Sequence, residues 1–197
     1  MIVTSTGLID SLKTYRSPKS KITRMLKNKE LIKIKRGLYL SKDDEEYSLK
    51  AISALIYGPS YVSFETALSH YDLIPERVSS ITCATYGKNK NKIFDTSLGR
   101  FQYYHIPDRA YPAGVTVETE YNYSYLIATP EKAILDMIYK SKIRDVDIGD
   151  FIKNNLRVDI EELLKLDHQE MSDLAVLYNR KACIDFANWF RKELRDA

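Results

Sequence analysis

The chain has 197 residues, 44% of them hydrophobic, with 30 Lys and Arg against 27 Asp and Glu. No apolar run approaches the roughly 18 residues of a membrane span, and the opening sequence MIVTSTGLIDSL lacks the basic-then-apolar order of a secretory signal. The two cysteines, Cys83 and Cys183, are far apart, which argues against a zinc site or a disulfide framework. We therefore expect a folded protein of the cytoplasm, with one domain of ordinary size and one small domain.

The charge is divided unevenly along the chain. Residues 1–42 hold 11 basic and 2 acidic side chains, a net charge of +9, whereas residues 43–197 hold 19 basic and 25 acidic side chains, a net charge of −6. The acidic run DDEE at 43–46 marks the boundary, so the sequence predicts two domains, 1–42 and 43–197, with different partners. A surface as positive as the first repels itself unless an anion lies against it, and the commonest such partner is a phosphate backbone.

Two short helices are predicted at the start of the chain. The first helix is expected to end at about Tyr15, and its N-terminus can be capped by the hydroxyl of Thr4, Ser5 or Thr6. Ser17 and Pro18 then favour the start of a second helix that runs to about Lys29. At 100° per residue its apolar residues fall on one side, and a polar and basic face points outward.

The next segment changes period and predicts a β-hairpin. Leu31–Lys35 alternates apolar and basic residues, Arg36–Gly37 makes a turn, and Leu38–Leu40 returns. Helix, turn, helix and hairpin follow each other in this order in a winged helix–turn–helix, whose second helix enters the DNA major groove. Alternatively the lysines only form a solvated surface, but they continue through two elements of different period with almost no acid between them, which favours nucleic acid.

The outward face of this region supplies the candidate DNA-binding residues. We expect Arg24 to approach base edges, helped by three polar neighbours: Ser20, Thr23 and Asn28. We expect the remaining basic residues to contact phosphates: Lys19, Lys21, Lys27, Lys33, Lys35 and Arg36.

The rest of the chain predicts an α+β domain. One helix has a buried stripe of Leu49, Ile52, Leu55 and Ile56, and a second, Phe64–Tyr71, is capped by Ser63. Four strands then form a small antiparallel sheet: Val78–Tyr86, Arg100–Ile106, Val115–Glu118 and Tyr123–Ala128. Thr129 caps a helix that presents Ala133, Ile134, Met137 and Ile138 to the core, and further helices end the chain. In the last of them Cys183 lies on the apolar stripe, so we expect it to serve packing.

The sequence contains no nucleophile elbow, phosphate-cradling glycine loop, HExxH motif or paired-carboxylate cluster, which favours a protein that is not an enzyme and uses no cofactor. The three histidines, His70, His105 and His168, have no metal-ligand spacing. We expect neither a metal nor a catalytic role for them, and we expect His70 to lie at a helix end.

Three sequence blocks resemble the AbiEi family of antitoxins, transcriptional regulators of type IV toxin–antitoxin systems that act in abortive infection against phage. The blocks are KSKITRMLKNKELIKIKRGLYL, PSYVSFETALSHYDLIPERVSSIT and YLIATPEKAILDMIY. The chain departs from the family pattern at Asp72, where glycine is more common, and in having one helix before the basic helix where a winged domain usually has two.

The resemblance implies an N-terminal winged helix–turn–helix that binds inverted repeats in its own promoter and represses the operon. It also implies that 43–197 is an antitoxin domain, which counters a nucleotidyltransferase-like toxin without a stable complex. The DNA role maps onto these positions: Lys19, Lys21, Arg24, Lys27, Lys33, Lys35 and Arg36.

Two other functions are compatible with the sequence. In the first, 43–197 is an interaction or enzymatic module that counters a nucleotidyltransferase toxin without acting as a repressor, and the basic segment only localises it on RNA or DNA. In the second, the chain is a plain protein–protein adaptor, which the +9 segment disfavours. No membrane partner is expected.

Overall fold

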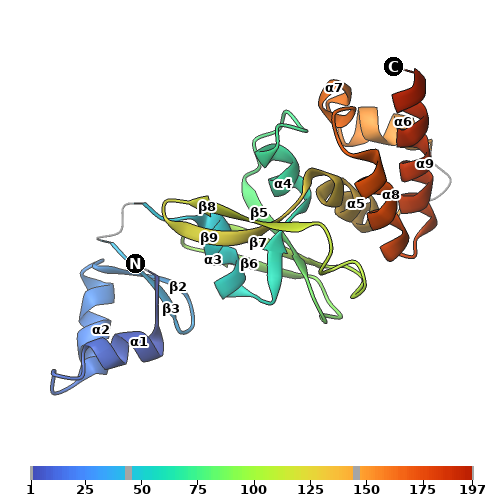
Figure 1. Ribbon diagram of the computed structural model, residues 1–197. Helices are drawn as coiled ribbons and strands as arrows, with labels where there is room; N and C mark the ends of the chain where they lie inside the picture. Colours follow the sequence, from blue (N-terminus) through green and yellow to red (C-terminus); the bar gives the residue numbers. More distant parts are fainter. Residues whose placement is uncertain (1, 43–45, 144–146, 197) are drawn as a thin grey trace.

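The computed structural model describes residues 2–42, 46–143 and 147–196 (Figure 1). The chain combines helices with two β-sheets, which confirms the predicted α+β class. The N-terminal unit, residues 2–42, lies at one end of the molecule and the C-terminal helices gather at the other, with the larger sheet between them. The acidic run at 43–46 lies outside the described residues except for Glu46.

The N-terminal unit consists of two helices and a three-stranded sheet. In chain order its elements are β1 (Ile2–Thr4), α1 (Ser5–Ser11), α2 (Pro18–Lys27), β2 (Leu31–Lys35) and β3 (Leu38–Ser41). The predicted hairpin is confirmed, and Gly37 supplies its turn with a φ of +85° that suits glycine. The sequence analysis missed β1, which pairs with β3 in the order β1-β3-β2.

The two predicted helices of this unit are present but shorter than expected. Thr4 caps α1 through a hydrogen bond from the Gly7 amide to its hydroxyl, at 3.2 Å. This helix ends at Ser11, well before the predicted Tyr15. Pro18 opens α2 as predicted, but the Ser17 hydroxyl shares a hydrogen bond with Ser20 and caps no backbone amide.

The second unit, residues 46–196, is built on a six-stranded sheet. Its strands are β4 (Ser60–Val62), β5 (Ser80–Thr85), β6 (Lys92–Thr96), β7 (Gly99–His105), β8 (Val115–Glu120) and β9 (Tyr123–Ala128). The order is β6-β7-β5-β4-β9-β8. The four predicted strands are present, but the sheet differs from the small antiparallel one expected, because β5 pairs with β7 and β4 with β9 in parallel.

The helices of this unit are α3 (Leu49–Ile56), α4 (Phe64–His70), α5 (Pro130–Ser141), α6 (Ile148–Asp150), the π-helix η1 (Phe151–Asn155), α7 (Ile160–Leu163), α8 (His168–Leu177) and α9 (Lys181–Asp196). Of these, α3, α4 and α5 pack against the sheet, and the later ones form the C-terminal end (Figure 1). Thr129 caps α5 as predicted, by accepting from the Lys132 amide, and His70 ends α4 as predicted. The predicted buried stripe of α3 is wrong at Leu55. Ile52 and Ile56 are buried, but Leu55 is 50% exposed, because this short helix buries a narrower face.

One large hydrophobic core joins the two units. It contains most buried residues of the second unit and also Ile34, Leu38 and Leu40 of the β2–β3 hairpin. A small separate cluster of Leu8, Ile22 and Leu31 holds the helices of the N-terminal unit together. Three apolar residues of the β2–β3 hairpin therefore pack in the main core of the second unit, although its basic residues belong to the positively charged segment 1–42.

The cysteines are packing residues. Cys83 and Cys183 are fully buried, and burial raises the pKa of each thiol to about 12. This confirms the prediction for Cys183, which lies on α9 with Phe186 and Phe190 in the core. None of the helices in the described ranges is long and apolar enough to cross a membrane.

Candidate nucleic-acid interface

The exposed face of α2 exists because the opposite face is anchored. Ile22 is 8% exposed, and Met25 and Leu26 pack on the small cluster formed with Leu8 and Leu31. Since residues three and four apart share a helix face, this anchoring turns the intervening residues toward solvent. The residues predicted on the outward side and at its margins are all exposed: Ser20, Thr23, Arg24, Lys27 and Asn28. Lys19, a predicted phosphate contact in the first turn, is also exposed.

The exposed polar residues of this face differ in their partners. The Thr23 hydroxyl donates to the Lys19 carbonyl at 3.1 Å, and the Asn28 amide donates to Glu30 at 2.9 Å. The Lys21 ammonium lies 5.5 Å from the centre of the Tyr15 ring, which holds this half-buried lysine beside the turn between the helices. Within the part of the chain that the structure describes, Arg24 makes no ion pair or side-chain hydrogen bond.

The three basic residues of the hairpin differ in exposure and in their partners. Lys33 and Arg36 are exposed, and among the described residues neither side chain makes an ion pair or a hydrogen bond, although the Lys33 carbonyl accepts from the Ser97 hydroxyl at 2.9 Å. Lys35 points the other way: its ammonium donates to the carbonyl of Ile56, at the end of α3. A cation there also suits the negative end of the helix dipole, so Lys35 joins the two units. The structure thus leaves Lys33 and Arg36 exposed on the hairpin, as the cations of α2 are, but it engages Lys35 with the second unit.

The positive charge of this surface is uncompensated. The acids of residues 2–42 are Asp10, which pairs with Lys13 at 3.6 Å, and Glu30, which accepts from Asn28. Among the described residues, no carboxylate pairs with the exposed cations: Lys19, Arg24, Lys27, Lys33 and Arg36. Such a surface attracts a polyanion at long range and can hold several phosphates at once.

A buried polar network in the second unit escaped the sequence analysis. Lys132 and Asp136 are both fully buried on α5, with 3.5 Å between the ammonium and the carboxylate. The Lys132 ammonium also donates to the Ala110 carbonyl at 2.6 Å and to the Tyr178 hydroxyl at 2.8 Å. Burial lowers the pKa of Lys132, and the Asp136 carboxylate acts in the opposite direction. The signal that could have predicted this pair is its spacing of four on a helix whose neighbouring residues are apolar.

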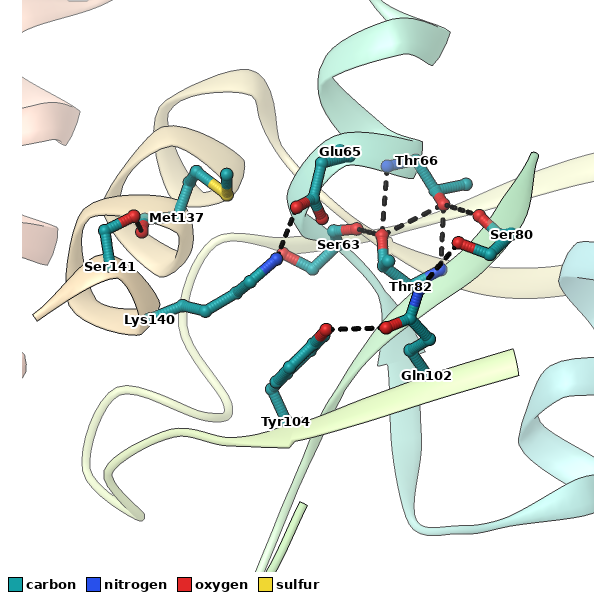
Figure 2. Close-up of polar contacts among 10 residues, drawn as sticks. All are labelled: Ser63, Glu65, Thr66, Ser80, Thr82, Gln102, Tyr104, Met137, Lys140 and Ser141. Atoms are coloured by element: carbon teal, nitrogen blue, oxygen red, sulfur yellow. Dashed lines mark hydrogen bonds and ion pairs between the residues drawn. The ribbon is translucent and has the colours of Figure 1, made fainter. Parts of the chain in front are cut away.

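A second polar network ties α4 to the sheet (Figure 2). The Thr82 hydroxyl donates to the Ser63 carbonyl at 2.7 Å and lies 3.0 Å from the Thr66 hydroxyl. Ser63 was predicted to cap α4, but its hydroxyl donates instead to Asp136 at 2.6 Å. Beside it, the Lys140 ammonium reaches from α5 to the Glu65 carboxylate of α4, as Figure 2 shows. These contacts brace the fold.

Within residues 2–42, 46–143 and 147–196, no group of three or more His, Cys, Asp or Glu side chains could hold a metal ion.

Comparison of the chain with protein-family models and with curated proteins finds no match.

Proposed function

We propose that the protein is a cytoplasmic DNA-binding repressor of its own operon and the antitoxin of a type IV toxin–antitoxin system. The observation that carries the DNA role is the set of exposed cations on α2 that no described carboxylate pairs with: Arg24 and Lys27 on the outward face and Lys19 in the first turn. The order helix, turn, helix and hairpin supports a winged helix–turn–helix arrangement. In it α2 would lie in the major groove, and β1 would support the sheet behind it.

The exposed residues suggest separate roles in DNA binding. Arg24 has the forked guanidinium that reads guanine, and Ser20, Thr23 and Asn28 flank it. Lys19, Lys27, Lys33 and Arg36 would hold phosphates, which gives affinity without sequence choice. Lys35 is better suited to fixing the hairpin on the second unit, because the Ile56 carbonyl already holds its ammonium.

The first prediction concerns salt. Binding of the full-length protein to its own promoter fragment should weaken with a log–log slope of about −3 to −4 against salt concentration, because the four proposed phosphate contacts release counterions. Fluorescence anisotropy at several salt concentrations measures this slope. A slope near zero would contradict the proposal.

The second prediction separates base contacts from phosphate contacts. Arg24→Ala should bring promoter and random DNA closer in affinity, by about 1–3 kcal/mol of lost discrimination. Lys33→Ala should weaken both DNAs about equally and make the salt slope shallower by about 1. Arg191→Ala, an exposed arginine of α9, is the matched control and should change neither value. Equal losses on both DNAs from Arg24→Ala and Lys33→Ala would refute the assignment of roles.

The antitoxin role is proposed for the second unit. Its net charge is negative, and the large core on which it is built includes hairpin residues but none from α2. The competing function, a module that is only localised on nucleic acid, predicts binding without preference for the promoter. Specific binding to two inverted repeats in the promoter, with repression of a reporter, would decide for the repressor.

A further inference from the structure

The second unit, which is acidic overall, gathers cations in one place. Two adjoining hollows of ≈ 490 and ≈ 300 Å³ share Asn89, His105, Tyr139 and Arg180. They lie where the 87–91 loop, the end of α5 and the turn between α8 and α9 meet. We call them together the basic cleft. Cavities of this size hold small-molecule ligands in many proteins.

The lining of the basic cleft is strongly positive. Four cations line it, Arg109, Lys140, Lys142 and Arg180, against a single acid, Asp108. Residues 43–197 as a whole have a net charge of −6, so this excess is local. Lys140 is held by Glu65, and its ammonium lies 4.4 Å from the centre of the Tyr104 ring. Among the described residues, no carboxylate pairs with the other three cations.

The arginine that both hollows share is held in place. The Arg180 guanidinium carbon lies 5.2 Å from the centre of the Tyr139 ring, and such stacking limits the freedom of the side chain. Arg180 immediately precedes α9, a helix of 16 residues, so the positive end of that helix dipole lies at the same rim. Preorganised positive charge of this kind is suited to phosphate oxygens.

The region also contains polar atoms that the fold leaves unpaired. In the described part of the chain, two buried side-chain atoms lack a hydrogen-bond partner: His105 Nδ1 and Glu65 Oε2. His105 lines both hollows, and Glu65 holds the Lys140 that lines one of them. Stable folds pair nearly all such atoms, and exceptions concentrate at functional sites.

We propose that the basic cleft binds the phosphates of a nucleotide, either a free nucleoside triphosphate or the terminal nucleotide of an RNA strand. Arg109, Lys142 and Arg180 would hold the phosphates. The Asn89 and Asn91 side chains offer amides to a base, with the Asn91 oxygen fixed by the His105 amide at 3.2 Å. This proposal stands independently of DNA binding by α2.

Isothermal titration of the full-length chain with ATP and with inorganic tripolyphosphate tests the proposal. Arg109→Ala and Arg180→Ala should each weaken ATP binding about tenfold, because each removes a charge-assisted contact to phosphate. Arg109 is exposed, so its replacement leaves the fold intact, and far-UV circular dichroism checks this. Arg191→Ala is the matched control and should bind ATP as the parent does.

A short single-stranded RNA is titrated into a chain whose α2 charges are reversed, so that binding at α2 does not contribute. If ATP binds and Arg109→Ala weakens its binding about tenfold, the cleft takes a free nucleotide; if only the RNA binds and the same variant weakens its binding, the cleft takes the end of an RNA strand. Binding of neither probe, tripolyphosphate binding as tight as ATP, or affinities unchanged by Arg109→Ala and Arg180→Ala would overturn it. Promoter binding should be unchanged in both cleft variants, which keeps this test separate from that of the repressor.

Discussion

Replacing Asp136 with alanine should lower the free energy of unfolding by about 3–5 kcal/mol, because it leaves a buried ammonium without its counter-ion. Asp136 is fully enclosed and accepts hydrogen bonds from Tyr61, Ser63 and Tyr178 at 2.9, 2.6 and 2.6 Å. The substitution would deprive three hydroxyl groups of their acceptor and would leave the Lys132 ammonium with hydrogen bonds to Ala110 and Tyr178 but with no opposite charge. Urea unfolding followed by circular dichroism measures the change.

Two comparison variants make this prediction specific. Lys132→Met should cost less than Asp136→Ala, because Asp136 keeps its three hydroxyl donors when the lysine is removed. Asp95→Ala should change stability little, because the Asp95–Arg100 ion pair is exposed and solvated. If Asp136→Ala were no more destabilising than Asp95→Ala, the network would not contribute to stability as described.

Reversing the charge of Lys19, Arg24 and Lys27 to glutamate should weaken promoter binding on the order of a thousandfold or more, because phosphate contacts become repulsive. Lys92→Glu, Arg191→Glu and Lys192→Glu together form the matched control, since they change the net charge equally at exposed positions of the second unit. A gel-shift assay at fixed salt compares the two chains. Equal losses in both would mean that net charge alone, and not the face of α2, governs binding.

The same charge-reversed chain separates the two proposed activities. It should fail to repress a promoter reporter and should still protect cells that express the toxin gene beside it. Truncation at residue 42 is a poorer test, because it removes Ile34, Leu38 and Leu40 from the main core. Loss of protection in the charge-reversed chain would place antitoxicity in the basic face and contradict the proposed division of labour.

Local signals in the sequence predicted local structure well. Thr129 and Pro130 start α5 as expected, and the alternation in Leu31–Lys35 followed by Gly37 gives the hairpin. These features depend on nearest neighbours along the chain, which a sequence displays directly. The exposed face of α2 was predictable for the same reason, because Ile22 fixes the rotation of the helix.

Long-range pairing was not predictable in this way. The short β4 strand was not recognised, and its parallel pairing with β9 depends on contacts far apart in the chain. β6 was not among the four predicted strands, and it pairs with β7 at the sheet edge. Lys35 has the same side chain as Lys33, and only the position of Ile56 in the folded chain distinguishes their roles.

The shared hairpin has a consequence for how the protein can diversify. Ile34, Leu38 and Leu40 of the hairpin lie in the large core, whereas Leu31 of β2 is buried with Leu8 and Ile22 in the small cluster. Swapping residues 5–28 between related chains would therefore transfer the exposed face of α2 and leave the large core untouched, provided that the new helices fit Leu31 of the host. A swap at residue 42 would instead mismatch the hairpin with its new host, so the junction that charge suggests is the one that recombination would avoid.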